Sequence, residues 1–152
     1  MHPTRLDPLA ARLRSARPVG ETFVAVRAAE PPAATAALPE QLDGLTTALG
    51  LQPLAQAWRE VNEVTARSIL HRILTKDLPY GRRLMTARAA AGFIDELWAD
   101  LPAARRHFTN ATFAGRAMQL VSWQPISTAK YDTGVASSGG HVLTLLWAAD
   151  NE

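Results

Sequence analysis

Residues 131–152 of the chain read YDTGVASSGGHVLTLLWAADNE, and this stretch decides the fold. Valine, leucine and tryptophan side chains favour extended backbone on both sides of the Ser-Ser-Gly-Gly segment at 137–140. Glycine adopts positive φ without a Cβ clash, and serine hydroxyls satisfy nearby backbone groups, so this segment suits a hairpin loop. The stretch therefore predicts two antiparallel strands joined by a four-residue loop at 137–140.

The same stretch also contains the residue types of a hydrolase triad, namely Asp132, Ser137, Ser138 and His141. A nucleophilic serine must lie within about 3 Å of an imidazole nitrogen, and a carboxylate must orient that imidazole. Successive strand residues point to opposite faces, and the chain has neither the G-x-S-x-G elbow nor the Walker lysine that follows a glycine-rich loop. We interpret the cluster as a turn, and no catalytic residue is expected.

Outward from the hairpin, segments 116–126 and 130–135 are also rich in strand-forming residues, whereas the preceding chain has a helical period. The strongest helical pattern covers residues 51–78, with Pro53 in the first turn and Pro79 just past the end. Eight residues of this segment fall on one half of a helical wheel: Leu54, Ala57, Trp58, Val61, Val64, Thr65, Ile69 and Ile73. Asn62 lies on that apolar side, so it is expected to be a buried amide with a structural hydrogen bond.

A second helix is predicted over residues 86–102, with Thr86 as its N-cap. Its apolar stripe consists of Ala90, Phe93, Ile94, Leu97 and Leu101. Gly92 weakens a helix by about 1 kcal/mol relative to alanine, so we interpret it as a point of close packing against a neighbour.

Helices that precede strands, without βαβ alternation, favour an α+β fold. We expect residues 1–152 to form a single domain in which two main helices pack on a small antiparallel sheet at the C-terminus. Residues 1–20 form a basic N-terminal segment, residues 21–30 alternate as a further candidate strand, and the Ala/Pro-rich residues 31–40 form a connection.

The composition excludes several classes of protein. The chain has no cysteine, which excludes disulfides, thiolate zinc sites and cysteine nucleophiles. No apolar run approaches the ~20 residues that span a bilayer, so a cytoplasmic protein without membrane contact is expected. Arginine outnumbers lysine 14 to 2, as is typical of GC-rich bacterial genomes, and the net charge is only +2. That charge is uneven, because residues 1–20 and 81–116 are basic whereas the last 36 residues are acidic.

The expected central helix carries polar residues at spacings of three and four, which places them on one face: Glu60, Glu63, Arg67 and His71. Two carboxylates and a histidine are suited to metal binding or proton transfer. However, the H-E-x-x-H spacing is missing, and Arg59 and Arg67 are available to neutralise the glutamates. We therefore interpret the face as ion-paired, with no metal or other cofactor, and as a source of charge for a protein interface.

Tryptophan is also favoured at interfaces, and the chain contains four. Trp147 lies near the end of the chain and is expected at a sheet margin beside Tyr131 and Asp132, where it would anchor a partner. The missing catalytic and metal motifs, the small size, the absence of cysteine and the uneven charge predict a non-enzymatic domain that binds a protein, with these residues as its candidate contacts. An immunity- or antitoxin-type inhibitor that blocks a partner such as a toxin is the preferred role.

Two alternatives remain open. The first is a small enzyme or ligand-binding domain with a pocket between the sheet and the central helix, which would use Glu60, Glu63, His71 or Asp132. The second is nucleic-acid binding through Arg82, Arg83, Arg105 and Arg106. It ranks below protein binding, because the net charge is small and no established nucleic-acid-binding motif accompanies these arginines.

Overall fold

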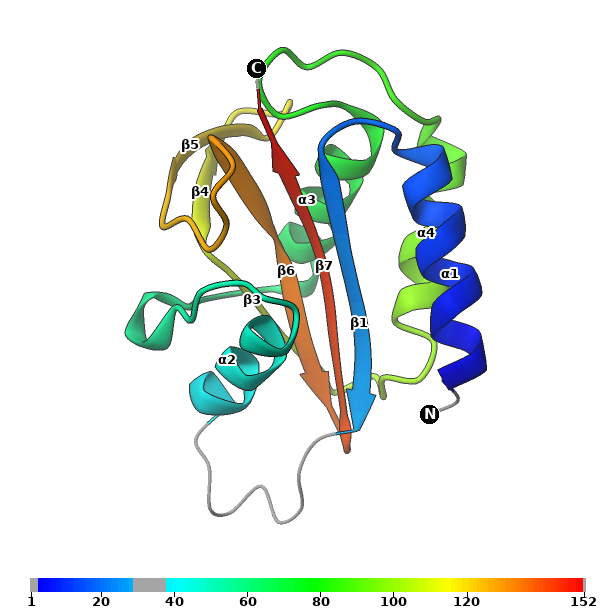
Figure 1. Ribbon diagram of the computed structural model, residues 1–152, viewed down its shortest axis with the longest axis vertical. Coiled ribbons are helices and arrows are strands. Elements are labelled where there is room, and N and C mark those ends of the chain that lie inside the picture. The colour runs from blue at the N-terminus through cyan, green and yellow to red at the C-terminus, as the bar shows by residue number, and fades with distance from the viewer. Residues whose placement is uncertain (1–2, 29–37, 152) are drawn as a thin grey trace.

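The computed structural model describes residues 3–28 and 38–151. It is built around a five-stranded antiparallel sheet, most of which can be followed in Figure 1. The strand order is β1-β7-β6-β3-β2, where the bounds are β1 Glu21–Ala28, β7 Val142–Asp150, β6 Tyr131–Gly139, β3 Arg106–Thr109 and β2 Arg59–Val61. A separate hairpin is formed by β4 (Ala111–Ala114) and β5 (Gln119–Trp123). The predicted α+β class is confirmed, and so is the strand expected at residues 21–30.

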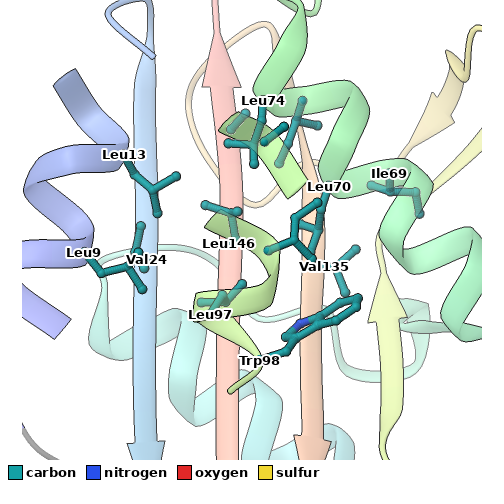
Figure 2. Packing of buried hydrophobic residues seen from close by; sticks show 14 of the residues in the cluster. Leu9, Leu13, Val24, Ile69, Leu70, Leu74, Leu97, Trp98, Val135 and Leu146 are labelled. Carbon is teal, nitrogen blue, oxygen red and sulfur yellow. The ribbon is translucent and has the colours of Figure 1, made fainter. Parts of the chain in front are cut away.

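Helices lie on both faces of this sheet. The helices α1 (Pro3–Ala16), α3 (Glu63–Thr75) and α4 (Ala87–Leu97) share one apolar cluster with Val24, Val135 and Leu146 of the sheet (Figure 2). On the opposite face, α2 (Leu38–Ala48) and the chain around the short helix η2 (Ala55–Ala57) form a second cluster with Leu145 and Trp147. Alternate residues of β6 and β7 therefore supply two cores.

The sheet and its covering helices include more of the chain than expected. The sheet is not confined to the C-terminus, because β1 pairs with β7 along its whole length, from Glu21↔Ala149 to Ala28↔Val142. The basic N-terminal segment contains α1, whose Leu9 and Leu13 are fully buried. With α2, this makes two further helices beside the two expected ones. Residues 31–37 of the expected Ala/Pro-rich connection lie outside the described residues, and residues 38–40 begin α2.

The predicted hairpin is confirmed, but its loop is shorter than expected. Strand β6 continues through Gly139 and β7 begins at Val142, which leaves Gly140 and His141 as the turn, with Gly140 at a φ of +57°. Ser137 and Ser138 lie inside the ladder, opposite Thr144 and Leu143. Serine favours loops, but these two residues lie in a strand because the Ser137 hydroxyl hydrogen-bonds to buried His107 of β3.

The predicted helix over residues 51–78 is wrong in its first half. Helix α3 begins only at Glu63, and Asn62 is its exposed N-cap, with Oδ1 accepting from the Thr65 backbone N–H at 2.8 Å. Trp58 belongs to the second core, where its indole N–H donates to Asp43 at 2.8 Å and its ring meets Trp147 edge to face. The helical period failed because the two halves of the segment bury their apolar residues on opposite faces of the sheet.

The second predicted helix is confirmed as α4, with the Thr86 hydroxyl accepting from the Ala89 backbone N–H at 3.1 Å, but it ends at Leu97 and not at residue 102. The interpretation of Gly92 is wrong, because a Cβ placed there would have no neighbour within 4 Å. Within the described part of the chain, no helix combines the length and the apolar character that crossing a bilayer requires.

Candidate functional site

Four charged residues gather where the amino end of α3 meets β2 and β3. Strand β2 pairs with β3 so that Glu60 lies opposite Phe108 and Val61 opposite His107. The Arg106 guanidinium donates to both carboxylate oxygens of Glu60, at 2.9 and 2.8 Å. Arg105 does the same to Glu63, with both distances 2.7 Å. We call Glu60, Glu63, Arg105 and Arg106 the ion-pair cluster.

Bidentate pairing gives the ion-pair cluster a fixed geometry, because each guanidinium fork matches a carboxylate in only one plane. The hydrogen bonds from Arg105 and then His107 lower the pKa of Glu63 to about 2. The hydrogen bond from Arg106 likewise lowers the pKa of Glu60. Both glutamates are therefore ionised at neutral pH.

The buried His107 links the ion-pair cluster to strand β6 by hydrogen bonds. Its Nε2 lies 3.0 Å from Glu63 Oε1, and its Nδ1 lies 2.7 Å from Ser137 Oγ. Burial lowers the pKa of His107, so the ring is neutral at neutral pH. Because ionised Glu63 only accepts, the Nε2–H donates to Glu63 and the Ser137 hydroxyl donates to Nδ1.

Trp98, which follows α4, covers this histidine. Its ring centroid lies 4.5 Å from that of His107, and the guanidinium groups of Arg67 and Arg105 lie 5.2 and 4.9 Å from the Trp98 ring. Arg67 also pairs with Asp95 at 3.0 Å, so Glu63 takes its cationic partner from Arg105, 42 residues away, and not from the neighbouring turn. The indole thus connects the buried histidine to the charged surface.

The order Ser137–His107–Glu63 resembles a hydrolase triad in its hydrogen bonds. Ser137 is fully buried in the middle of the sheet, however, and His107 is only 1% exposed. A nucleophile must contact its substrate, and this hydroxyl faces protein on all sides. The chain of hydrogen bonds therefore holds Glu63 in place and does not present a nucleophile in this structure.

The surface beside the ion-pair cluster carries an exposed apolar side chain. Val64 follows Glu63 in the first turn of α3 and is 76% exposed. It stands out because the apolar positions later in this helix, such as Ile69 and Ile73, are fully buried. Val64 and the ion-pair cluster together define what we call the α3 surface.

His71, Tyr131, Asp132 and Trp147, which were also expected to bind a partner, lie elsewhere. His71 is two turns further along α3, beside a different surface groove. Asp132 and Trp147 are fully buried, with the indole N–H donating to the Asp132 carboxylate at 3.1 Å. Their interpretation as surface anchors is corrected, because this carboxylate also accepts from Ser127 and Ile126 and so holds the loop before β6. Tyr131 is half-buried and stacks on Trp123 with a centroid distance of 5.6 Å.

The pocket proposed for the enzyme alternative does not lie where it was expected. The space between α3 and the sheet is filled by fully buried side chains, among them Ile69, Leu70 and Leu146 (Figure 2). Among the described residues, no three His, Cys, Asp or Glu side chains are placed to hold a metal ion.

The arginines of the nucleic-acid alternative do not share one surface. Arg105 and Arg106 belong to the ion-pair cluster at the amino end of α3, whereas Arg82 binds Asp77 at 2.9 Å beyond its carboxyl end. A helix of 13 residues is about 20 Å long, so the two pairs lie at opposite ends of α3. Three of the four already hold a carboxylate, and a phosphate would have to compete for them.

Comparison of the chain with protein families, curated proteins and solved structures gives no match. The function is therefore argued from the geometry of the α3 surface.

Proposed function

We propose that this chain is a non-enzymatic protein-binding domain that uses the α3 surface, in the manner of an immunity- or antitoxin-type inhibitor. The observation that carries the proposal is Val64, which is 76% exposed beside two bidentate ion pairs. An exposed apolar side chain next to a fixed ion pair is what a protein interface combines, since its apolar groups lie beside polar groups that exclude water.

Rigidity of the α3 surface supports binding as opposed to simple solvation. Ordering a long side chain at an interface costs about 0.5–1.5 kcal/mol, and the guanidinium groups of Arg105 and Arg106 are already ordered by their glutamates. His107 and Ser137 hold Glu63 from inside the sheet. A partner would therefore meet a surface that needs little rearrangement.

The charges also define the partner. Each arginine is neutralised by its own glutamate, so the α3 surface presents alternating charge without a strong net sign. A protein with a shallow apolar recess and polar groups of both signs at its edge fits this pattern, and such complementarity contributes specificity more than raw affinity.

The test is affinity capture from the source organism with three forms of the full chain: wild type, Val64→Asp and the control Val121→Asp. Val121 lies on β5, outside the α3 surface, and is 58% exposed, so the control places the same charge on another exposed valine. We expect wild type and V121D to capture the same protein and V64D to bind it at least ~10-fold more weakly, as expected for the centre of an interface.

Two results would contradict the proposal: equal capture by all three forms, or turnover of a small molecule by the purified chain. The inhibitor role has a separate readout. The captured protein is assayed with and without the chain, and its activity should fall when the wild type is added and persist when V64D is added.

A further inference from the structure

A groove at the other end of α3 carries charge of a single sign. Two adjoining hollows of about 230 Å³ each lie between the carboxyl half of α3 and the turn of the β4–β5 hairpin. They share Arg72, Lys76 and Ala117. One hollow is also lined by His71 and Arg116, and the other extends to Tyr80. We call Arg72, Lys76, Arg116 and His71 the basic groove.

Among the described residues, the cations of the basic groove form no ion pair with a carboxylate, although the charges of Asp77 and Asp150 act on Arg72 from a greater distance. Neither Asp nor Glu lines the two hollows, and within residues 8–28 and 38–151 no ion pair involves Lys76 or Arg116. Arg83 adds a further positive charge at the margin, because its backbone pairs with Lys76 in an antiparallel bridge. This arrangement contrasts with the ion-pair cluster, where each arginine has its own glutamate.

The Arg72 side chain is held in position by hydrogen bonds that use only one of its three nitrogens. Its Nη1 donates to the backbone carbonyls of Lys76 and Asp77, both at 3.0 Å, which fixes the guanidinium against the end of α3. No partner among the described residues accepts from its Nε or Nη2. Burial lowers the pKa of Arg72, so an anion in the groove would offset a cost that the folded chain already bears.

The charge of Asp77 favours the charged form of Arg72, but its carboxylate oxygens are hydrogen-bonded elsewhere. Its carboxylate accepts from the backbone N–H groups of Tyr80 and Arg82 and from the Arg82 guanidinium at 2.9 Å. The Asp77 carboxylate therefore hydrogen-bonds within its own loop, between residues 77 and 82.

The opposite wall is held in place by backbone geometry. Gly115 and Met118, at the two ends of the hairpin turn, have φ values of +71° and +52°. A positive φ at a non-glycine residue is strained and persists only where surrounding contacts enforce it. Met118 packs against the apolar cluster that α1, α3 and α4 form with the sheet, which we call the helix-side core. This contact holds Arg116 beside α3.

We propose that the basic groove binds the phosphate groups of a phosphate-bearing ligand, with Arg72 and Lys76 between two adjacent phosphates and Arg116 on the outer one. Phosphate is favoured over a carboxylate because several donors approach from both walls, and a phosphate offers three or more acceptor oxygens where a carboxylate offers two. Two hollows on either side of shared cations suit consecutive phosphates. These occur in a diphosphate and along a single nucleic-acid strand. In the second case the exposed Tyr80 at one end, which has the Arg82 guanidinium 4.7 Å from its ring centroid, offers its other face for stacking.

The experiment measures binding of two probes, inorganic pyrophosphate and a twelve-residue thymidine oligonucleotide, to the full chain by calorimetry at low salt. The test variant is the double substitution Lys76→Ala with Arg116→Ala. The control is Arg59→Ala with Arg88→Ala, which removes two exposed arginines outside the groove and changes the net charge equally. We expect at least one probe to bind wild type and control alike, and the test variant to bind it at least 10-fold more weakly.

The two probes distinguish the source of the phosphate. Binding of pyrophosphate alone indicates a small diphosphate ligand, and binding of the oligonucleotide indicates a single strand. In the second case log K should fall with log salt, and the slope should become shallower by about 1.4 in the test variant, because each lost phosphate contact removes about 0.7.

Three results would overturn the proposal. The first is that neither probe binds, and the second is that the test and control variants weaken binding equally. The third is that a glutamate oligomer of the same charge displaces a bound probe as strongly as pyrophosphate does. The last would show that the groove responds to charge and not to phosphate. None of these outcomes bears on the α3 surface, which lies at the opposite end of the helix.

Discussion

Glu63 combines a local role with a long-range one. It is the first residue of α3, where the helix dipole favours a negative side chain. Its carboxylate also accepts from Arg105 and His107, which lie 42 and 44 residues further along the chain. One residue thus joins the start of a helix to strand β3 of the sheet.

The same residue makes stability dependent on pH. The pKa of Glu63 is about 2 in the folded chain against an ordinary 4.5, so its contribution is complete above pH 4.5 and is lost as the pH falls toward 2. The pKa of His107 lies below its ordinary 6.5, so the folded state favours the neutral ring. Protonation therefore opposes folding as the pH drops below 6.5.

We expect the free energy of unfolding, measured by urea denaturation between pH 2 and 8, to decline below pH 6.5 and again below pH 4.5. Glu63→Gln keeps an amide oxygen as acceptor but cannot ionise, so this variant should lose stability at pH 7 and show a flatter curve between pH 4.5 and 2. A curve parallel to that of wild type throughout would contradict the assignment.

At the scale of elements, the β6–β7 hairpin depends on a glycine that sequence reasoning did not single out. Gly134 lies opposite Trp147, and a Cβ there would lie 2.1 Å from the Leu146 carbonyl oxygen and 2.7 Å from the Trp147 Cα. Both obstacles belong to the backbone of β7, which cannot move without breaking the ladder. Gly134 therefore permits the close approach of the two central strands.

Alanine at two glycines should give opposite results. We expect Gly134→Ala to destabilise the chain by about 2–3 kcal/mol, in the upper range for overpacking. Gly92→Ala meets open space on the exposed side of α4 and should stabilise it by about 0.5–1 kcal/mol. Urea denaturation of both variants measures the difference, and equal effects at the two positions would show that strand contact is not what Gly134 provides.

At the scale of the whole molecule, the first helix and the last strand are fastened together. The Arg17 guanidinium donates to both oxygens of Asp150, at 2.8 and 2.7 Å, and this ion pair is buried. Arg17 also donates to the Ile73 carbonyl, and Asp150 accepts from the Leu78 N–H. Two remote parts of the chain and the carboxyl end of α3 thereby meet in one network.

The two cores share β6 and β7, so they should unfold together. Trp98 reports on the helix-side core, and Trp58 and Trp147 report on the other. With 5-fluorotryptophan in all four positions, the fluorine resonances should give a single urea midpoint. This outcome would support the prediction of a single domain, and distinct midpoints for Trp98 and Trp147 would contradict it.

The sequence by itself determined what depends on neighbouring residues. Strand-forming residues around a glycine pair predicted the β6–β7 hairpin, and Thr86 before an apolar stripe predicted α4. These predictions succeeded because caps, turns and backbone preferences act over a few residues. The candidate site was only partly predicted. Glu60 and Glu63 were identified, and Arg105 and Arg106 were named as candidates for nucleic-acid binding, but the pairing of these arginines with the glutamates was not predicted.

The tertiary structure alone decided the rest. Trp58 and Ile69 share a helical period in sequence, yet they pack into different cores, because the sheet offers two apolar faces and α3 can reach only one. His107 meets Ser137 only through the register of β3 against β6, and Asp132 can be buried beside Trp147 because the indole, Ser127 and Ile126 all donate to its carboxylate. Strand register and the pairing of buried polar groups depend on contacts between distant residues, which a local pattern does not encode.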